Sequence, residues 1–186
     1  MARFTLYSDA FANGEAIPAR HARDGDNVSP PLAWENPPAR VKSFALIVED
    51  PDAPFTVFRH WVVYDIPGDW RALPEGLPDG AESVPLREGV NSFGNDHYDG
   101  PMPPPLHGVH HYHFRLIALA VPQLKLSPDA TADRLWRNAR RHVCGEAQLI
   151  GTYKRTLAKT LFGKKAKTRE SAEAEAPAAA RTREHA

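Results

Sequence analysis

Short apolar runs alternate with prolines and other turn residues along most of the chain. Residues 44–48 are a continuous β-prone apolar run that ends at an Asp-Pro-Asp-Ala-Pro turn, which predicts a strand buried on both faces. Residues 60–66 form a second run, closed by a Pro-Gly pair, and residues 109–121 form a third. The pattern predicts short strands joined by stiff turns.

Alternation along these runs predicts which side chains share a face, because successive residues of a strand point to opposite sides. In the second run one face is expected to carry His60, Val62, Tyr64 and Ile66. In the third run, one face is expected to carry His110, Tyr112, Phe114 and Leu116, and the other His111, His113, Arg115 and Ile117.

One helix is predicted near the C-terminal end of the folded region. Ser127-Pro128-Asp129 supplies an N-cap followed by a proline, and Leu135, Ala139 and Val143 then recur every fourth residue. Gly145 is the expected stop, and residues 147–153 read as one more strand. A strand-rich chain with one clear helix favours a mainly β fold in which one sheet packs on another.

Composition narrows the class of protein. The 186 residues include 18 prolines, a single cysteine and equal numbers of acidic and basic residues. One cysteine cannot form an internal disulfide, and zero net charge argues against a nucleic-acid partner. No apolar run approaches the roughly 20 residues of a membrane span, and no secretory signal is read, so a cytoplasmic protein is expected.

The chain divides at residue 155. Residues 1–155 mix apolar runs with turns and are expected to form one domain. Residues 156–186 hold seven basic and four acidic residues and only one aromatic. They are interpreted as a low-complexity, disordered tail.

Histidines provide the first functional indication, since five of the nine lie between residues 97 and 113. His111 and His113 could share a metal ion, but no cysteine pair, His-Glu-x-x-His helix or obvious third ligand accompanies them. No metal or cofactor is therefore predicted. The alternative is a group formed by Asp50, His60 and His110, each at the end of a different predicted strand.

Such a group suits a phosphoryl anion, because imidazole N–H groups donate to anionic oxygens and a carboxylate orients a ring. Tyr112, on the same face as His110, could add a hydroxyl donor and a flat wall. The proline-rich segment 100–105 could supply a rigid rim. Structural interpretations stay open, since an Asp before proline often closes a turn and a histidine among apolar residues often belongs to the core.

Six linked motifs resemble the bacterial branch of the phosphatidylethanolamine-binding protein family, which includes the Raf kinase inhibitor protein. They are DGDNVSPPLAW at 24–34, VEDPDAP at 48–54, RHWVVYDIP at 59–67, FGNDHYDGPMPPP at 93–105, HGVHHYHFRLIAL at 107–119 and LIGTY at 149–153. The resemblance covers residues 3–155. It implies a large central sheet packed on a smaller one, one or two peripheral helices and a small cavity for phosphate-type anions.

Matching the motifs by position implies a set of ligand-binding residues. Two departures from the family pattern are Met102, where relatives often have cysteine, and His111, where an arginine is usual. The implied binding residues are Asp50, His60, Gly100, Pro101, Met102, Pro103, Pro104, His110 and Tyr112.

The predicted function is binding of a phosphate-type anion or phospholipid headgroup. The alternative is a regulatory inhibitor that acts on a kinase or serine protease through surface contacts, as the resemblance allows. An enzyme is not predicted, because no Gly-x-Ser-x-Gly elbow and no cysteine with a plausible base are present. The resemblance also makes a homodimer an expectation.

Overall fold

A computed structural model describes residues 2–77 and 85–155. The predicted tail, 156–186, lies outside the described residues. The described elements, in chain order, are β1 (Thr5–Tyr7), the 3-10 helix η1 (Ala19–His21), β2 (Leu32–Glu35), β3 (Ser43–Asp50), β4 (Phe58–Pro67), β5 (Ala72–Leu73), β6 (Arg87–Glu88), β7 (Val109–Leu119), α1 (Ala132–Ala139) and β8 (Val143–Lys154).

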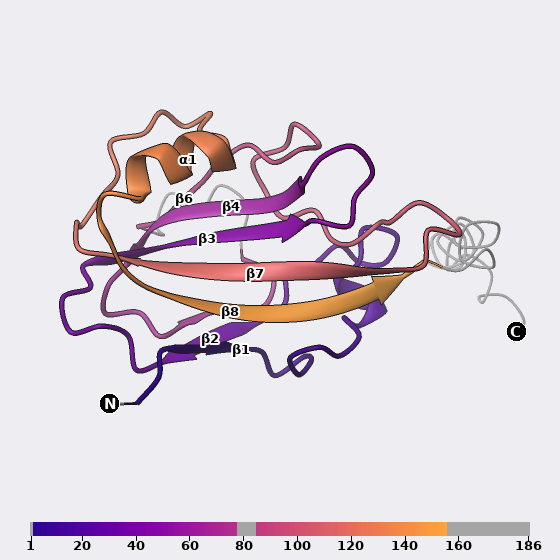
Figure 1. Cartoon of the computed structure of the whole chain (residues 1–186), viewed down its shortest axis with the longest axis horizontal. Helices are drawn as coiled ribbons and strands as arrows, with labels where there is room; N and C mark the ends of the chain where they lie inside the picture. The colour runs from indigo at the N-terminus through magenta and orange to yellow at the C-terminus, as the bar shows by residue number, and fades with distance from the viewer. Residues whose placement is uncertain (1, 78–84, 156–186) are drawn as a thin grey trace, which may run out of the picture.

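The strands form two sheets (Figure 1). The larger sheet has the order β6-β4-β3-β7-β8 and the smaller the order β1-β2-β5, with antiparallel pairing throughout. β3 occupies the centre and is buried almost along its whole length, as its continuous apolar run predicts. The predicted mainly β fold of a large sheet packed on a smaller one is confirmed.

Aromatic side chains fill the space between the two sheets. Phe44 of β3 packs its ring against Trp34 of β2, with centroids 5.2 Å apart, and against Phe4 at 6.1 Å. Phe114 of β7 similarly contacts Phe11, at 5.6 Å. Burial of these rings supplies much of the hydrophobic stabilisation that joins the sheets.

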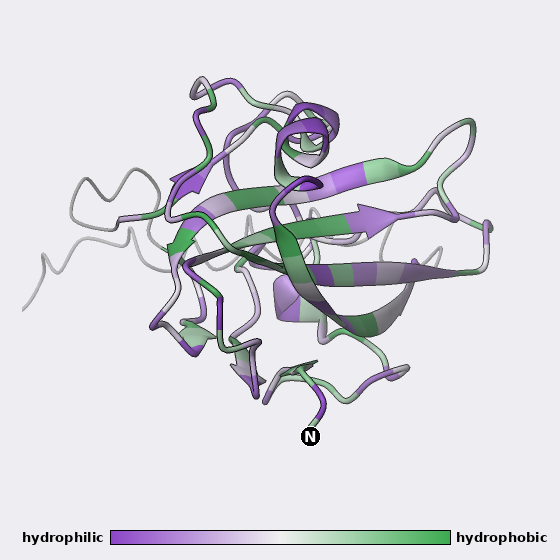
Figure 2. Ribbon diagram, turned by 60° about the vertical axis from the view of Figure 1, so that its left-hand side comes forward, coloured by the Kyte–Doolittle hydropathy of each residue, from purple (hydrophilic) through white to green (hydrophobic). Residues whose placement is uncertain are grey.

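Helix α1 covers part of the opposite face of the large sheet. Its buried residues, Ala132, Leu135 and Ala139, pack with Val62 and Tyr64 of β4. Figure 2 shows long hydrophobic stretches on the central strands and a mostly hydrophilic helix. The helix is thus amphipathic and peripheral.

Both predicted ends of the helix are wrong. Ser127 does not cap it, because residues 127–130 form a separate turn closed by a bond from the Ala130 N–H to the Ser127 carbonyl. The N-cap is Thr131, whose hydroxyl accepts from the Arg134 N–H. A threonine hydroxyl that accepts from a backbone N–H of the first turn is a common N-cap. The helix therefore begins after Thr131 and not after the upstream Ser127.

The helix also ends earlier than expected, at Ala139, and Val143 already belongs to β8. β8 pairs with β7 from one end to the other. Val143, which the four-residue spacing of apolar residues assigned to the helix, therefore takes part in the strand pairing instead. Gly145 is a strand residue rather than a stop. A Cβ there would lie 2.6 Å from Pro38 Cγ, so the glycine permits close packing against that proline.

Two register shifts in β4 overturn the expected sharing of a face by His60, Val62, Tyr64 and Ile66. Each shift inserts an extra residue into β4 relative to β3, and such bulges redirect the following side chains. Val62 and Tyr64 face the helix side, whereas Ile66 joins the core between the sheets. His60 also contacts a side chain of that core, Tyr112. The alternation predicted for β7 from His110 to Leu116 is confirmed.

No helix among the described residues is long and apolar enough to cross a membrane.

We expect Phe44→Ala to lower the free energy of unfolding by about 3–5 kcal/mol, because it leaves a cavity between the two sheets. Urea denaturation measures the change. Tyr7→Thr, at a half-exposed position of β1, is the matched control and should change stability by less than about 0.5 kcal/mol. A loss of under about 1 kcal/mol in Phe44→Ala would contradict the role given to this ring.

Candidate functional site

Three neighbouring strands bring the predicted group together at one end of the large sheet. Asp50 is the last residue of β3, His60 lies near the start of β4 and His110 near the start of β7. Because β3 runs antiparallel to both neighbours, its end lies beside their starts (Figure 1). The three side chains line a cavity of about 300 Å³.

Most of the predicted binding residues line this cavity. Besides Asp50, His60 and His110, they are Met102, Pro103, Pro104 and Tyr112. The remaining wall comes from Ala53, Pro54, Phe55, Phe58 and Phe93. The cavity therefore combines a small polar group with a wall of proline and aromatic side chains, as ligand sites commonly do.

Gly100 and Pro101 lie outside the cavity lining. A Cβ on Gly100 would lie 2.0 Å from the His21 carbonyl oxygen, so this glycine allows two backbone segments to approach. The Pro101 carbonyl accepts a hydrogen bond from the Arg23 N–H. Both residues hold the proline-rich segment against the N-terminal region instead of lining the space.

A buried hydrogen bond between a histidine and a carboxylate forms the polar centre of the site. His110 Nδ1 donates to Asp50 Oδ2 at 2.7 Å, and both side chains are almost fully buried. Asp50 Oδ1 also accepts from the Asp52 N–H at 2.9 Å, so Asp50 closes the turn and orients the imidazole as well. The Nε2 atom of His110 is the ring nitrogen left for a ligand.

Tyr112 adds a buried hydroxyl that lacks a well-placed hydrogen-bond partner. Its ring is fully buried, and its hydroxyl oxygen is buried with no hydrogen bond of good geometry. Burial and the neighbouring Asp50 carboxylate raise the pKa of the phenol far above its usual range. The group is therefore a neutral donor at every physiological pH.

His60 is oriented by a backbone carbonyl. Its Nδ1 lies 2.8 Å from the Asp99 carbonyl oxygen, which can only accept, so Nδ1 carries the proton and Nε2 is left for a ligand. The ring packs edge-on against Tyr112, with centroids 5.1 Å apart. Burial lowers the pKa of His60 despite the opposing effects of the Asp99 carbonyl and the Asp50 charge. His60 is thus neutral near pH 7 before a ligand binds.

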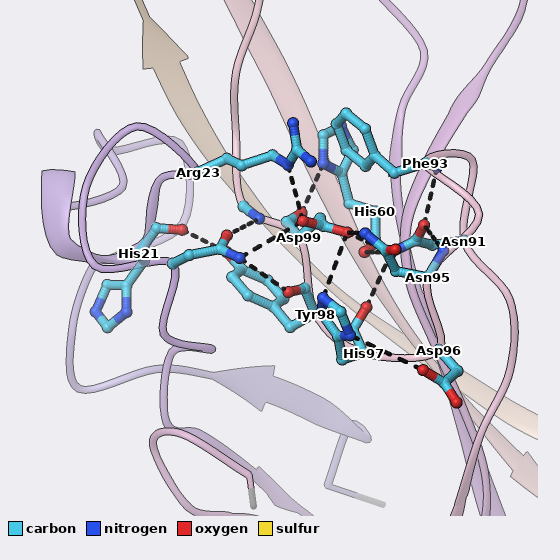
Figure 3. Close-up of polar contacts among 12 residues, drawn as sticks. His21, Arg23, His60, Asn91, Phe93, Asn95, Asp96, His97, Tyr98 and Asp99 are labelled. Carbon is cyan, nitrogen blue, oxygen red and sulfur yellow. Dashed lines mark hydrogen bonds and ion pairs between the residues drawn. The ribbon is translucent and has the colours of Figure 1, made fainter. Parts of the chain in front are cut away.

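The Asp99 side chain anchors the loop that positions His60 (Figure 3). Its carboxylate accepts from Arg23 Nε at 2.8 Å, Asn91 Nδ2 at 2.9 Å and Asn95 Nδ2 at 2.8 Å. Burial opposes ionisation of Asp99, but these hydrogen bonds outweigh it and lower its pKa. The Asp99 N–H also donates to the His60 carbonyl, so the two residues brace each other.

The sequence reasoning missed this support. Asp99 and Asn91 lie on a loop whose sequence has no periodic pattern. The contact to His60 uses the Asp99 backbone carbonyl, and because every residue has such a carbonyl, the amino-acid type does not predict the contact. A concentration of Asn and Asp between residues 91 and 99 was the available signal, because these side chains favour local backbone hydrogen bonds. The Phe55, Phe58 and Phe93 wall was missed as well.

The histidines considered as metal ligands have other partners. His111 Nδ1 lies 2.8 Å from Asp52 Oδ2, and His113 Nδ1 lies 2.8 Å from Gln148 Nε2. Within residues 2–77 and 85–155, no three His, Cys, Asp or Glu side chains converge on a point that could hold a metal ion.

Comparison with known proteins agrees with this geometry. The sequence profile described as "Phosphatidylethanolamine-binding protein" matches residues 7–154. The chain belongs to the phosphatidylethanolamine-binding protein family. The resemblance that the six motifs carry is therefore confirmed, and the matched span contains the whole cavity.

Relatives of this family member include a bacterial and an archaeal protein. The chain is 43% identical over 150 residues to a UPF0098 protein of Aquifex aeolicus, with 81% of this chain and 88% of the relative covered. It is 45% identical over 152 residues to a UPF0098 protein of Methanothermobacter thermautotrophicus, with 81% and 98% covered. The fold matches the crystal structure of Escherichia coli YbcL, a member of the mammalian PEBP family, with a TM-score of 0.79, 29% identity and coverage of 83% and 99%.

We expect Asp99→Asn to lower the free energy of unfolding at pH 7 by on the order of 2 kcal/mol, because hydrogen bonds to the charged carboxylate are lost. Since the folded-state pKa of Asp99 is lowered, its contribution is present above the unfolded pKa of about 4 and disappears as pH falls below it. Urea denaturation at several pH values measures both effects.

The difference between wild type and Asp99→Asn should therefore shrink in acid. The control is Asp133→Asn, which changes a largely exposed carboxylate on α1. If Asp99→Asn and Asp133→Asn gave equal small losses at pH 7, the Asp99 network would not be supporting the loop.

Proposed function

We propose that the cavity binds a phosphate-type anion, as the head of a phosphorylated compound. The observation that carries the proposal is the buried Asp50–His110 pair with Tyr112 and His60 lining the same otherwise apolar space. Burial of the Asp50 carboxylate beside His110 carries a desolvation cost. A bound anion would share the His110 proton donor and use the Tyr112 hydroxyl, which has no well-placed partner.

The hydrogen-bonding capacity of these groups matches a phosphoryl group. His110 can offer its Nε2–H when the ring is protonated, and a hydrogen bond from a protonated ring to a phosphoryl oxygen is charge-assisted. Tyr112 offers its O–H, and His60 offers Nε2–H once it takes up a proton. The three donors approach from two strands and could meet separate oxygens of one phosphoryl group.

The size of the cavity supports a substituted ligand. At about 300 Å³, it lies at the lower end of the range that accommodates whole small-molecule ligands. The wall of Phe58, Phe93 and Met102 would face the non-phosphoryl part. We therefore infer a phosphomonoester or phosphodiester headgroup as the ligand class.

Family membership supports a binding protein in general terms, and the proposal includes no catalytic step. Inhibition of a kinase or serine protease stays a prediction, because no contact within the described residues selects such a target. A cytoplasmic location and a homodimer likewise stay predictions.

His110→Asn is expected to weaken binding of phosphoethanolamine about 10- to 100-fold, because the ligand loses a charge-assisted donor. The asparagine amide can still donate to Asp50, so the pair's internal hydrogen bond survives. Calorimetric titration gives the affinity, and thermal melting verifies folding. His113→Asn is the matched control, since it alters the opposite face of the same strand. Equal affinities in the two variants would refute the proposed site.

Binding of dimethyl phosphate, which has no titratable proton near neutral pH, is expected to tighten as pH falls from about 8 to about 6. His60 is neutral before the ligand binds because burial lowers its pKa, and a bound anion would favour its protonated form. Uptake of one proton strengthens binding by at most about tenfold per pH unit.

His60→Asn tests the origin of this pH dependence. The asparagine amide can still donate to the Asp99 carbonyl but does not titrate. Its affinity for dimethyl phosphate should be weaker and should rise less steeply as pH falls. If the affinity of His60→Asn rose with falling pH as steeply as that of wild type, a group other than His60 would be taking up the proton.

A further inference from the structure

The outer surface of α1 carries an excess of positive charge. Arg134 and Arg137 lie within the helix, Arg140 is its C-cap and Arg141 follows, and all four side chains are exposed. Asp133 is the single acidic residue of the helix. Figure 2 shows the helix as mostly hydrophilic. Figure 1 shows it over the part of the large sheet where β8 begins, away from the end of β3 where the cavity lies.

Three of these arginines have no carboxylate to pair with. Within residues 2–77 and 85–155, no ion pair is formed by Arg137, Arg140 or Arg141, whereas Arg134 pairs with Asp129 at 3.8 Å. Several arginines elsewhere do meet a carboxylate, namely Arg20, Arg23, Arg59, Arg115 and Arg155. Three uncompensated charges thus lie close together at the end of α1.

Stability of the helix does not account for so many cations at this place. Arg134, Arg137 and Arg140 follow each other at intervals of three, so their side chains are neighbours on the helix surface and repel each other. One cation in the last turn offsets the negative end of the helix dipole, and Arg137 lies there. Arg140 and Arg141 add repulsion to this arrangement. A partner outside the described residues would supply the missing negative charge.

An exposed tryptophan adjoins these arginines. Trp136 is 37% exposed, and the guanidinium of Arg115 lies 5.4 Å from the centroid of its ring. The Arg140 N–H donates to the Trp136 carbonyl, so Arg140 lies one turn further along the same side of the helix. Tryptophan and arginine are enriched among the few residues that dominate binding at protein interfaces. The surface thus combines uncompensated charge with an aromatic side chain.

We propose that this surface, the α1 patch of Trp136, Arg137, Arg140 and Arg141, binds an acidic segment of a partner protein. Each guanidinium can meet a carboxylate through two parallel hydrogen bonds, which gives direction as well as attraction. Residues 136–141 span about 8 Å along the helix axis, close to the length of three residues of an extended peptide. The inference goes beyond the proposed anion binding and does not depend on it.

The distribution of charge favours a short acidic segment over a nucleic acid. In residues 1–155, acidic residues outnumber basic ones, so the domain exerts no long-range attraction on a polyanion. Beside the patch, Arg59 pairs with Asp133, and Arg115 pairs with Glu146. A phosphate backbone that continued past the patch would find these arginines already paired, whereas a short segment would not extend that far.

The test measures binding of a labelled acidic peptide to the full chain by fluorescence anisotropy. The peptide repeats two glutamates and one leucine, so it offers carboxylates together with an apolar side chain. The variant Arg137→Gln/Arg140→Gln/Arg141→Gln, called the arginine variant, removes the charges of the α1 patch. Glutamine keeps a polar side chain of good helix propensity, so the helix should remain folded.

Two further variants separate a defined surface from general charge. The control Lys164→Gln/Lys165→Gln/Lys167→Gln, called the lysine variant, removes the same charge from residues 156–186. Trp136→Leu removes the aromatic ring and leaves every charge in place. An oligothymidylate with the same charge as the peptide is the second probe. Thermal melting verifies that each variant is folded.

We expect wild type and the lysine variant to bind the peptide with equal affinity, and the arginine variant to bind it about tenfold or more weakly. Trp136→Leu should weaken binding about threefold or more. The oligothymidylate should bind wild type more weakly than the peptide does. The arginine variant should bind phosphoethanolamine as wild type does, because the α1 patch does not line the cavity. These results together would support the proposal.

Other outcomes overturn it. No binding of the peptide by wild type would reject an acidic partner, and equal losses in the arginine and lysine variants would show that only net charge matters. Unchanged affinity in the arginine variant would place the binding elsewhere, and unchanged affinity in Trp136→Leu would reject the patch as defined. If the oligothymidylate bound as tightly as the peptide and lost affinity in the same variants, the surface would be one for nucleic acid.

Discussion

The hydrogen bond between Asp50 and His110 joins the end of β3 to the start of β7 and places a carboxylate beside an imidazole in the buried site. A buried carboxylate is tolerated only when its hydrogen bonds are good. Here the carboxylate meets His110 with one oxygen and the Asp52 N–H with the other. The same carboxylate therefore fixes both the turn after β3 and the orientation of the His110 ring. Both residues line the cavity.

Two imidazoles at this site are held in different ways, and the difference has a chemical consequence. His110 donates to a carboxylate, whereas His60 donates to the Asp99 carbonyl and has its pKa lowered by burial. His60 is therefore a neutral ring near pH 7 before a ligand binds. Under the proposed anion binding, His60 would take up a proton as the anion arrives, which would couple binding to pH.

The cavity is flanked by a buried hydrogen-bond network on one side and by exposed apolar side chains in nearby loops. On the side of His60, the Asp99 carboxylate ties Arg23, Asn91 and Asn95 into a buried network. Phe55, which lines the cavity, and Leu106, just before β7, are both exposed and have left-handed backbone conformations. The first arrangement holds the polar groups in position, and the second leaves two apolar side chains exposed.

Much of the fold and part of the site could be predicted from the chain alone. The apolar run of β3, the alternation in β7 and the Asp-Pro turn determined a buried strand with Asp50 at its end and a partner strand carrying His110 and Tyr112. These are local patterns, and local sterics and burial suffice to interpret them. Tertiary structure alone decided the bulges that turn His60 toward Tyr112, the end of α1 at Ala139 and the support of His60 by Asp99. Each of these depends on pairing with a distant segment, through backbone groups that every residue possesses and no side-chain pattern can reveal.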